Sequence, residues 1–192
     1  MRMKLLLVPD IQTVMKIGVL ALQGSVSEHR LCMERLNMDV VDVREPSDMN
    51  GLKGLIMPGG ESTTLRKLLV NSGLWDAISG SDIPIMATCA GAILMGESDD
   101  VTFEKMDFRI DRNYYGRQKD SFEKDIRIGN NQEFRGIFIR APAIVSVGDG
   151  TEAIAWDGEM VIGCTMDRHM ALTFHPELSN DLTFHQMWIE EL

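Results

Sequence analysis

The sequence predicts an α/β fold: a doubly wound, mostly parallel sheet with helices on both faces and antiparallel strands added in the second half. In the first half, short apolar runs alternate with amphipathic segments, the pattern of parallel strands joined by helices. In the second half, apolar runs of strand length recur between turns that contain Gly and Asp. The length of 192 residues suits one domain of this kind with a substantial core.

Each element of the first half has its own signal. A continuous apolar run indicates a buried strand, and apolar residues spaced among charges indicate an amphipathic helix. Strands are expected at residues 16–22, 40–43, 54–60 and 83–88, with glycine turns after the first and third. Helices are expected over residues 25–38, over 65–73 with Ser62 or Thr63 as the cap and Gly73 as the stop, and over 90–96.

The second half is dominated by strands. Apolar β-type runs occupy residues 136–142, 143–147, 152–156, 160–166 and 169–177, and we expect antiparallel strands that extend the same sheet or fold over its edge. Residues 180–192 are expected to form a terminal helix capped by Asn180 or Asp181. Because repeats, linkers and low-complexity tracts are not seen, we expect one domain at residues 16–192, preceded by an N-terminal extension at residues 1–15.

Composition narrows the classes of function. Lys+Arg 19 against Asp+Glu 29 gives a formal net charge of −10, and such a surface repels nucleic-acid phosphates and anionic lipid. The three cysteines cannot all pair, which favours a reducing, cytoplasmic setting. The apolar run at residues 5–8 is too short for a signal peptide, and no stretch approaches the ~20 apolar residues of a membrane span. No Cys, His and Asp cluster has the spacing of a zinc site, so no metal is expected.

Cys89 lies where the fourth expected strand meets a helix, and its neighbours from Thr88 to Ala92 are all small. A tight strand-to-helix turn that exposes a nucleophile needs such neighbours. The helix N-terminus also stabilises a thiolate, and the amide of Ala90 would point at a developing oxyanion. A buried packing cysteine fits the local pattern equally well. Cys32 and Cys164, within a helix and a strand, are expected to be structural.

A thiol nucleophile needs a base, and the base needs a residue that orients it. His175 ends a strand and is followed by Pro176, which holds the segment extended, so that Glu177 faces the same way as the histidine. A Cys–His–Glu triad is therefore plausible. His29 is expected at the surface of a helix, and His169 and His185 have no distinctive neighbours.

The loop at residues 58–63, PGGEST, is the third candidate element. Its glycines leave backbone amides open to a ligand, which makes Gly60 a second possible oxyanion donor. Glu61 could hold a substrate ammonium group. A glycine turn followed by a capping box explains the same residues without any ligand.

In this order and spacing, six motifs resemble the triad-type (class I) glutamine amidotransferases and, within them, the family of glutaminase subunits of pyridoxal 5′-phosphate synthase. The resemblance covers the chain from about residue 16 to the C-terminus. The six motifs are IGVLALQGSVSEH, GLIMPGGESTT, TCAG, RNYYGRQKDSFE, FIRAP and FHPEL. The fourth, RNYYGRQKDSFE, is the distinguishing one, because other members of the superfamily lack it.

The resemblance implies hydrolysis of L-glutamine to L-glutamate and ammonia. Cys89 is then the nucleophile, His175 the acid and base, and Glu177 the residue that orients His175. The amides of Gly60 and Ala90 would stabilise the oxyanion. The residues at substrate-binding positions are Gln23, Gly60, Glu61, Ser62, Arg112, Ile139 and Arg140. From sequence alone, Arg112 could equally be a solvated arginine and Arg140 part of a strand-edge salt bridge.

The resemblance also implies a partner. In the family, ammonia is channelled to a (β/α)₈ synthase subunit, and glutaminase subunits decorate a dodecameric synthase core, which makes a complex of 12 + 12 subunits. The vitamin is the partner's product, so no cofactor is expected in this chain. One departure is that family members generally read G-T-C-A-G at the nucleophile, whereas Ala87 stands before Thr88 here. We expect the change to affect packing only.

Three other functions stay open. A glutaminase that feeds imidazole glycerol phosphate synthesis would use the same chemistry, although the RNYYGRQKDSFE segment argues against it. A cysteine hydrolase or peptidase on a related fold would leave Glu61 without a role. A non-catalytic partner subunit would not need an intact set of Cys89, His175 and Glu177.

Overall fold

The structure, a computed structural model, describes residues 15–112, 114, 121–129 and 132–192. The expected N-terminal extension, apart from Met15, lies outside the described residues. So do residues 113 and 115–120 of the segment that distinguishes the resembled family.

The described residues include a large sheet whose parallel part combines four strands from the first half of the chain with β11 from near its end. Its strand order is β2-β1-β3-β4-β11-β10-β9-β6-β7, and β1, β2, β3, β4 and β11 pair in parallel. The remaining pairs are antiparallel, so the predicted α/β class is confirmed. The parallel strands are β1 (Lys16–Leu20), β2 (Asp39–Val43), β3 (Gly54–Met57), β4 (Ile85–Thr88) and β11 (His169–Leu172), and the antiparallel ones are β6 (Phe122–Ile128), β7 (Gln132–Phe138), β9 (Glu152–Asp157) and β10 (Met160–Met166).

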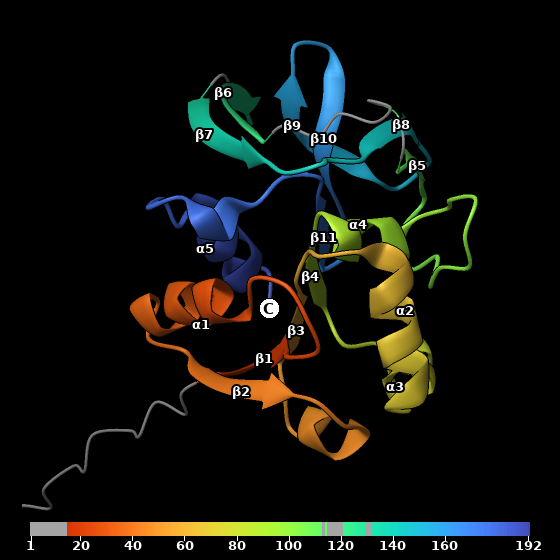
Figure 1. The fold of residues 1–192 in the computed structure, drawn as a ribbon. Helices are drawn as coiled ribbons and strands as arrows, with labels where there is room; N and C mark the ends of the chain where they lie inside the picture. The colour runs from red at the N-terminus through yellow and green to blue at the C-terminus, as the bar shows by residue number, and fades with distance from the viewer. Residues whose placement is uncertain (1–14, 113, 115–120, 130–131) are drawn as a thin grey trace, which may run out of the picture.

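Helices cover both faces of the parallel half (Figure 1). On one face lie α1 (Val26–Arg35) and α5 (Thr183–Glu190), and their Met33, Phe184 and Trp188 share an apolar core with Ile17 and Ile56 of the sheet. The opposite face packs against α2 (Ser62–Asn71), α3 (Leu74–Ser79) and α4 (Ala90–Met95) through a second apolar core. The doubly wound arrangement follows from these two cores.

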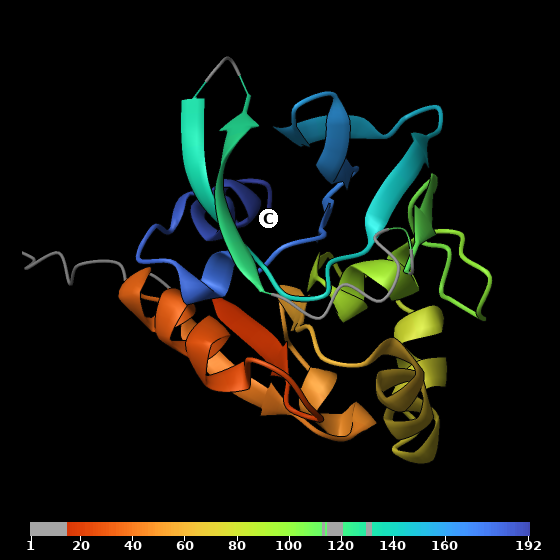
Figure 2. The same cartoon turned by 45° about the horizontal axis from the view of Figure 1, so that its top comes forward.

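The antiparallel strands stand beyond β11, and the β6–β7 hairpin forms the far end of the sheet (Figure 2). Phe134 of β7 packs against Phe184 of α5, with ring centroids 4.9 Å apart. A separate two-stranded sheet pairs β5 (Phe108–Asp111) with β8 (Ala143–Val147). Of the two expected arrangements, extension of the same sheet is confirmed for β6, β7, β9 and β10, whereas β8 belongs to the separate two-stranded sheet. The run at residues 169–177 was wrongly expected to be antiparallel throughout, because β11 pairs in parallel with β4 and is antiparallel only to β10.

Several local expectations are wrong. The cap of α2 is Glu61, whose carboxylate accepts from the amides of Thr63 and Thr64, and not Ser62 or Thr63. His29 was expected at the surface, yet it is fully buried, because it shares the core-facing side of α1 with Cys32 and Met33. The terminal helix begins at Thr183, and its cap position is Leu182, although the Asp181 carboxylate accepts from the Thr183 amide.

The parallel strands point their carboxyl ends to one edge of the sheet, where ligands of doubly wound folds bind. Gln23 follows β1, Gly60 follows β3, Cys89 follows β4 and His175 follows β11. The fold therefore gathers at one edge four residues that are far apart in the sequence.

Candidate active site

Cys89 occupies a strained turn between β4 and α4. Its backbone has φ 49° and ψ −108°, a conformation that non-glycine residues rarely adopt and that is concentrated at functional sites. The turn is held by a hydrogen bond from the Cys89 amide to the carbonyl of Leu172, N···O 2.8 Å. A Cβ on Gly91 would overlap the carbonyl oxygen of Met57, so only glycine lets α4 start this close to β3. This is the geometry of a nucleophile elbow.

Ala87, the departure from the resembled family, is an ordinary strand residue. It is fully buried and pairs with Met57 of β3 and Ala171 of β11. Its φ is not in the positive range, so the backbone here does not require glycine. The expectation that this change concerns packing is confirmed.

His175 and Glu177 form a buried pair beside Cys89. Nδ1 of His175 lies 2.7 Å from Oε1 of Glu177, and the residues are 5% and 4% exposed, so the carboxylate fixes which ring nitrogen carries the proton. The predicted contact exists, but not through an extended segment. Pro176–Leu178 is a short 3₁₀ turn, and this turn brings Glu177 back to the ring.

The imidazole edge of His175 and the side chain of Cys89 flank Gly59. A Cβ on Gly59 would lie 2.7 Å from Cε1 of His175 and 3.1 Å from Cβ of Cys89. The Cys89 thiol donates to the carbonyl of Ile139, S···O 3.7 Å, and Nε2 of His175 has no hydrogen-bond partner among the described residues. A buried nitrogen is thus left available on the side of the ring away from Glu177.

The electrostatics of the pair favour an imidazolium next to a carboxylate. Burial alone would lower the pKa of His175, but its interactions with Cys89 and Glu177 raise that pKa to about 10. Burial alone would raise the pKa of Glu177, but the neighbouring His29 and His175 lower it to about 2. Around neutral pH, His175 is therefore protonated and Glu177 ionised.

The glycine loop after β3 is positioned by close backbone contacts. Gly60 has φ 126°, which favours glycine, and a Cβ there would lie 2.6 Å from Nε2 of Gln23. Gln23 in turn donates from Nε2 to the carbonyl of Glu61, N···O 3.0 Å. The loop that carries Gly60 is therefore fastened to the end of β1. Ser62, predicted to line the same pocket, is 5% exposed.

Glu61 and Arg112 form an ion pair at the outer end of this loop. Nη2 of Arg112 lies 3.3 Å from Oε1 of Glu61, and Nη1 donates to Oγ1 of Thr63 at 3.1 Å and to Oδ2 of Asp100 at 2.6 Å. Burial would raise the pKa of Glu61, but hydrogen bonds from Thr64 and Thr63 lower it to about 2. Of the three charged residues at predicted substrate-binding positions, Glu61 and Arg112 thus lie side by side.

No hydrogen bond or ion pair of the described residues joins Arg140 to Glu61 or Arg112. Arg140 is exposed, it has φ 46°, and it makes no hydrogen bond or ion pair with any other predicted site residue in the described part of the chain. Ile139, directly before it, reaches the site through its carbonyl and is 37% exposed. The amide of Ala90 belongs to the first turn of α4, where backbone N–H groups lack partners within the helix.

Sequence reasoning missed a buried histidine pair behind the triad. Nδ1 of His29 lies 3.0 Å from Nε2 of His185, and Nε2 of His29 lies 3.2 Å from Oγ1 of Thr88. The same Nε2 is 3.4 Å from Oε2 of Glu177. The i, i+3, i+4 spacing of His29, Cys32 and Met33 was the signal that could have placed His29 on the buried face of α1.

Cys32 and Cys164 are free and buried, as expected of structural residues. Burial, with the Glu177 charge nearby, raises the pKa of Cys32 to about 11, and burial alone raises that of Cys164 to about 12. Neither thiol is therefore a ready nucleophile.

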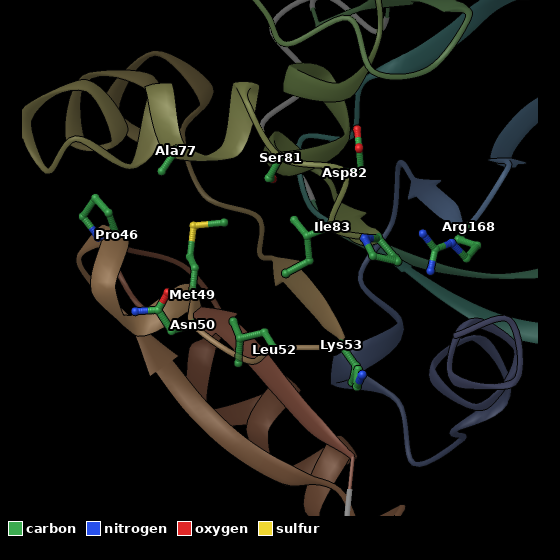
Figure 3. A pocket seen from close by; sticks show the side chains of 11 residues that line it. Pro46, Met49, Asn50, Leu52, Lys53, Ala77, Ser81, Asp82, Ile83 and Arg168 are labelled. Atoms are coloured by element: carbon green, nitrogen blue, oxygen red, sulfur yellow. The ribbon is translucent and has the colours of Figure 1, made fainter.

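A cavity of about 510 Å³ lies at the opposite edge of the sheet, before β3 and β4. Met49, Leu52 and Ile83 converge on it, with Lys53 and Arg168 nearby (Figure 3). The described residues that line it include no cysteine and no histidine, so we place the chemistry at the Cys89 edge of the sheet. Within the described ranges, no three His, Cys, Asp or Glu side chains gather as metal ligands. None of the helices in this part of the chain has the length and apolar character needed to cross a bilayer.

Comparisons with known proteins agree with one another. The model of the SNO glutamine amidotransferase family matches residues 19–192. A protein of Methanocaldococcus jannaschii named pyridoxal 5′-phosphate synthase subunit PdxT is 43% identical over 171 residues, which cover 87% of this chain and 92% of that protein. A protein of the same name from Staphylococcus haemolyticus is 39% identical over 182 residues, covering 93% and 99%.

Solved structures give the same result for the fold. A crystal structure described as a glutamine amidotransferase superposes with a TM-score of 0.84 at 36% identity, covering 91% of this chain and 97% of that one. A putative GMP synthase subunit from Thermoplasma acidophilum superposes with a TM-score of 0.70 at 18% identity, which supports the fold alone.

Proposed function

The chain belongs to the SNO glutamine amidotransferase family, and from this premise we propose that it is the glutaminase subunit of a pyridoxal 5′-phosphate synthase. It hydrolyses L-glutamine to L-glutamate and ammonia through Cys89, His175 and Glu177. The observation that carries the proposal is the strained turn that holds Cys89 beside a histidine already bonded to a buried carboxylate. The names of the relatives support the choice of acceptor.

In the first half of the reaction, the Cys89 sulfur attacks the carbon of the side-chain amide as a thiolate. The C=O electrons move to oxygen, and the amides of Gly60 and Ala90 stabilise the oxyanion. His175 then gives its Nε2 proton to the amide nitrogen, the C–N bond breaks, and ammonia leaves a glutamyl thioester. The unpartnered Nε2 is the nitrogen that this step needs.

In the second half, water attacks the thioester carbonyl. Neutral His175 accepts a proton from that water at Nε2, and collapse of the intermediate expels the Cys89 thiolate and releases glutamate. Glu177 keeps the other ring proton on Nδ1 and stabilises the imidazolium in both halves.

The charged end of glutamine needs partners of opposite sign. Glu61 and Arg112, 3.3 Å apart, offer a carboxylate and a guanidinium side by side, which matches an α-ammonium next to an α-carboxylate. Arg140 supplies further positive charge next to Ile139. Gln23 and Ser62 complete the pocket, and Gln23 also holds the glycine loop.

The ammonia passes to a synthase subunit with a (β/α)₈ fold, which builds pyridoxal 5′-phosphate, in a complex of 12 + 12 subunits. The vitamin is then a product of the partner, and the glutaminase reaction needs no cofactor. The relatives' names identify them as subunits of such a synthase, which supports a partner for this chain.

The test is glutamate formation from glutamine, measured with and without a pyridoxal phosphate synthase subunit, for the native chain and for Cys89→Ala. Partner-dependent activity that disappears in the variant is expected. Activity that does not depend on the partner would keep the chemistry but remove the assigned acceptor. Equal activity in Cys89→Ala and the native chain would overturn the role of Cys89.

A further inference from the structure

The mechanism leaves a fully buried pair of histidines unused. His29 of α1 and His185 of α5 are both 0% exposed and contact each other through Nδ1 of His29 and Nε2 of His185, 3.0 Å apart. They are distant in the sequence, and the contact between α1 and the turn that carries Glu177 brings them behind the triad. Two buried polar rings need a reason to be there, since burial of an unpaired polar group is costly.

The outer oxygen of Glu177 faces this pair. Oε1 of Glu177 is taken by His175, but Oε2, although buried, has no hydrogen-bond partner among the described residues. The nearest ring nitrogen is Nε2 of His29, at 3.4 Å. A buried ionised carboxylate requires donors on both oxygens, and the His29 ring is placed to be the second donor.

The positions of the protons follow from what each group can accept. Ionised Glu177 only accepts, so Nε2 of His29 must carry the proton that faces it. Nδ1 of His29 is then an acceptor, and it must receive the Nε2 proton of His185. In this arrangement His185 of α5 donates to His29 of α1, and His29 donates to Glu177. Glu177 also accepts the Nδ1 proton of His175, so each contact determines which nitrogen of the ring carries its proton.

We propose that His29 is a positioning residue for the triad, which holds the carboxylate of Glu177 against His175, and that His185 fixes the tautomer in which His29 can do so. The proposal rests on the proposed function of Cys89, His175 and Glu177. Neither histidine touches the substrate or the reacting atoms, and both act through Glu177.

The surroundings keep both histidines neutral. Burial, with His175 also contributing, lowers the pKa of His29, against the opposite influence of Glu177 and Glu28. Burial lowers the pKa of His185 to about 3, with His29 and Arg35 acting in the same direction and Glu177 opposing. Neutral rings donate one proton in one direction, as the chain of hydrogen bonds requires.

Thr88 offers a competing acceptor. Its hydroxyl is 3.2 Å from Nε2 of His29, slightly closer than the carboxylate. The charge of Glu177 makes it the stronger acceptor, because hydrogen bonds to an ionised group are roughly twice as strong as neutral ones. Removing the hydroxyl should therefore leave the proton of His29 with Glu177.

The test uses His29→Phe, which keeps a ring without a donor, and His29→Gln, whose amide can place an N–H near the position of Nε2. Met33→Leu is the matched control, since Met33 is buried on the same face of α1 and takes no part in the polar contacts of His29, His185, Thr88 and Glu177. Glutamine hydrolysis is measured with the synthase subunit present. We expect His29→Phe to lower kcat about 10- to 100-fold, the usual loss when a group that orients a functional side chain is removed, with KM unchanged. His29→Gln should recover part of the loss.

A second readout needs neither glutamine nor the partner. The second readout is the rate at which iodoacetamide alkylates Cys89 in the isolated chain, measured as a function of pH. The rate follows the fraction of Cys89 that is a thiolate, and this fraction depends on how strongly His175 keeps its proton. Without His29 the carboxylate of Glu177 is no longer held against His175, so the imidazolium loses part of its stabilisation, and in His29→Phe the rise of the alkylation rate should move to higher pH. His185→Phe should shift it in the same direction, while Met33→Leu should not.

Each remaining result decides the matter. Native kcat and a native alkylation profile in His29→Phe would overturn the proposal, as would an equal loss in Met33→Leu. If Thr88→Val reproduces the effects of His29→Phe, the proton of His29 serves Thr88 and the proposal is wrong. If His29→Phe does not fold, native behaviour of both His29→Gln and His185→Phe overturns it. If the native chain makes no glutamate with the partner, the proposed function fails, and the alkylation profiles still decide the role of His29.

Discussion

Gly59 lies between two residues of the proposed triad, His175 and Cys89. A Cβ there would lie 2.7 Å from the ring of His175 and 3.1 Å from Cβ of Cys89, whereas its φ is one that alanine can adopt. Gly59→Ala should therefore displace His175 with little strain on the backbone. We expect kcat to fall at least about tenfold while the melting temperature stays near that of the native chain, since small misplacements of a catalytic group can cost about 100-fold.

The control is Gly80→Ala at the end of α3, where the added Cβ meets only the carbonyl of Asp76 at 3.3 Å. Steady-state kinetics and thermal unfolding of both variants separate the two effects. Native kcat in Gly59→Ala would mean that the ring of His175 can move aside without loss of activity, and that its position is not critical.

Glu177→Gln keeps the size of the side chain and removes its charge. The amide oxygen can still accept from Nδ1 of His175, but the imidazolium that forms in each half of the reaction loses its buried counter-ion. We expect kcat to fall by about 10² to 10⁴, on the scale known for the equivalent change in a serine protease triad, with KM little changed. Kinetics with saturating partner measure this, and a loss below fivefold would argue against a role for the carboxylate's charge.

Single residues differ in how far the sequence could predict them. Cys89 could be predicted because small residues surround a reactive side chain. His175 could be predicted because it stands at the end of an expected strand. His29 does not, because its importance comes from His185, which lies 156 positions away in the chain. The sequence predicts a functional role for Glu61. Its second role, as the cap of α2, depends on the extended backbone conformation of this residue, which cannot be read from the sequence.

At the scale of the element, the start of α2 links stability to substrate binding. Removing the carboxylate in Glu61→Ala leaves the amides of Thr63 and Thr64 without their cap and Arg112 without its partner. We expect a loss of about 1 kcal/mol in the free energy of unfolding, the usual value of an N-cap, together with a raised KM for glutamine. Urea unfolding and steady-state kinetics check the two effects.

Thr64→Val is the matched variant, since it removes one hydrogen bond to the same carboxylate and keeps the charge. It should cost less stability and leave KM native. A native KM in Glu61→Ala would show that the carboxylate caps the helix without binding the substrate. The pKa of Glu61 is lowered to about 2, so the cap is complete above about pH 4.5 and is lost only as the pH falls towards 2.

Strands and helices with strong periodicity were predictable, and those formed by tertiary contacts were not. The apolar strands β1, β3 and β4 appear in the sequence as continuous runs. The strands β5 and β6 were missed because their sequences, FRID and FEKDIRI, alternate with charges and are stabilised by pairing with distant partners. The short helix α3 was missed because Gly73 ends α2 and, through a left-handed conformation, also begins α3.

At the scale of the whole molecule, buried histidines set how stability depends on pH. Burial lowers the pKa of His29, His169 and His185, so these rings are neutral in the fold and become protonated near pH 6.5 once the chain unfolds. The unfolded state then binds more protons below pH 6.5, and stability must fall as the pH falls. The pKa of His175 is instead raised to about 10, so its contribution is complete below pH 6.5 and is lost as the pH rises towards 10.

These opposite signs predict a maximum of stability near pH 6.5 to 7 within the range from pH 5 to 8. Below pH 4.5 the lowered pKa values of carboxyls such as Glu177 add a further loss on acidification. One net proton taken up on unfolding changes stability by about 1.4 kcal/mol per pH unit, so the melting temperature should fall about 3 °C or more per unit between pH 6 and 5.

Thermal unfolding followed by circular dichroism at pH 5, 6, 7 and 8 measures both limbs of the stability curve: the fall below the maximum (the acid limb) and the fall above it (the alkaline limb). His169→Asn is the informative variant, because the Asn oxygen can still accept from the amide of Ile85, as Nδ1 of His169 does at 3.1 Å, and this residue lies at the edge of the sheet away from Cys89. It should make the acid limb shallower and leave the alkaline limb unchanged, because His175 is intact. A melting temperature that stays constant from pH 7 to 5 would mean that these rings accept protons inside the fold, which their burial makes costly.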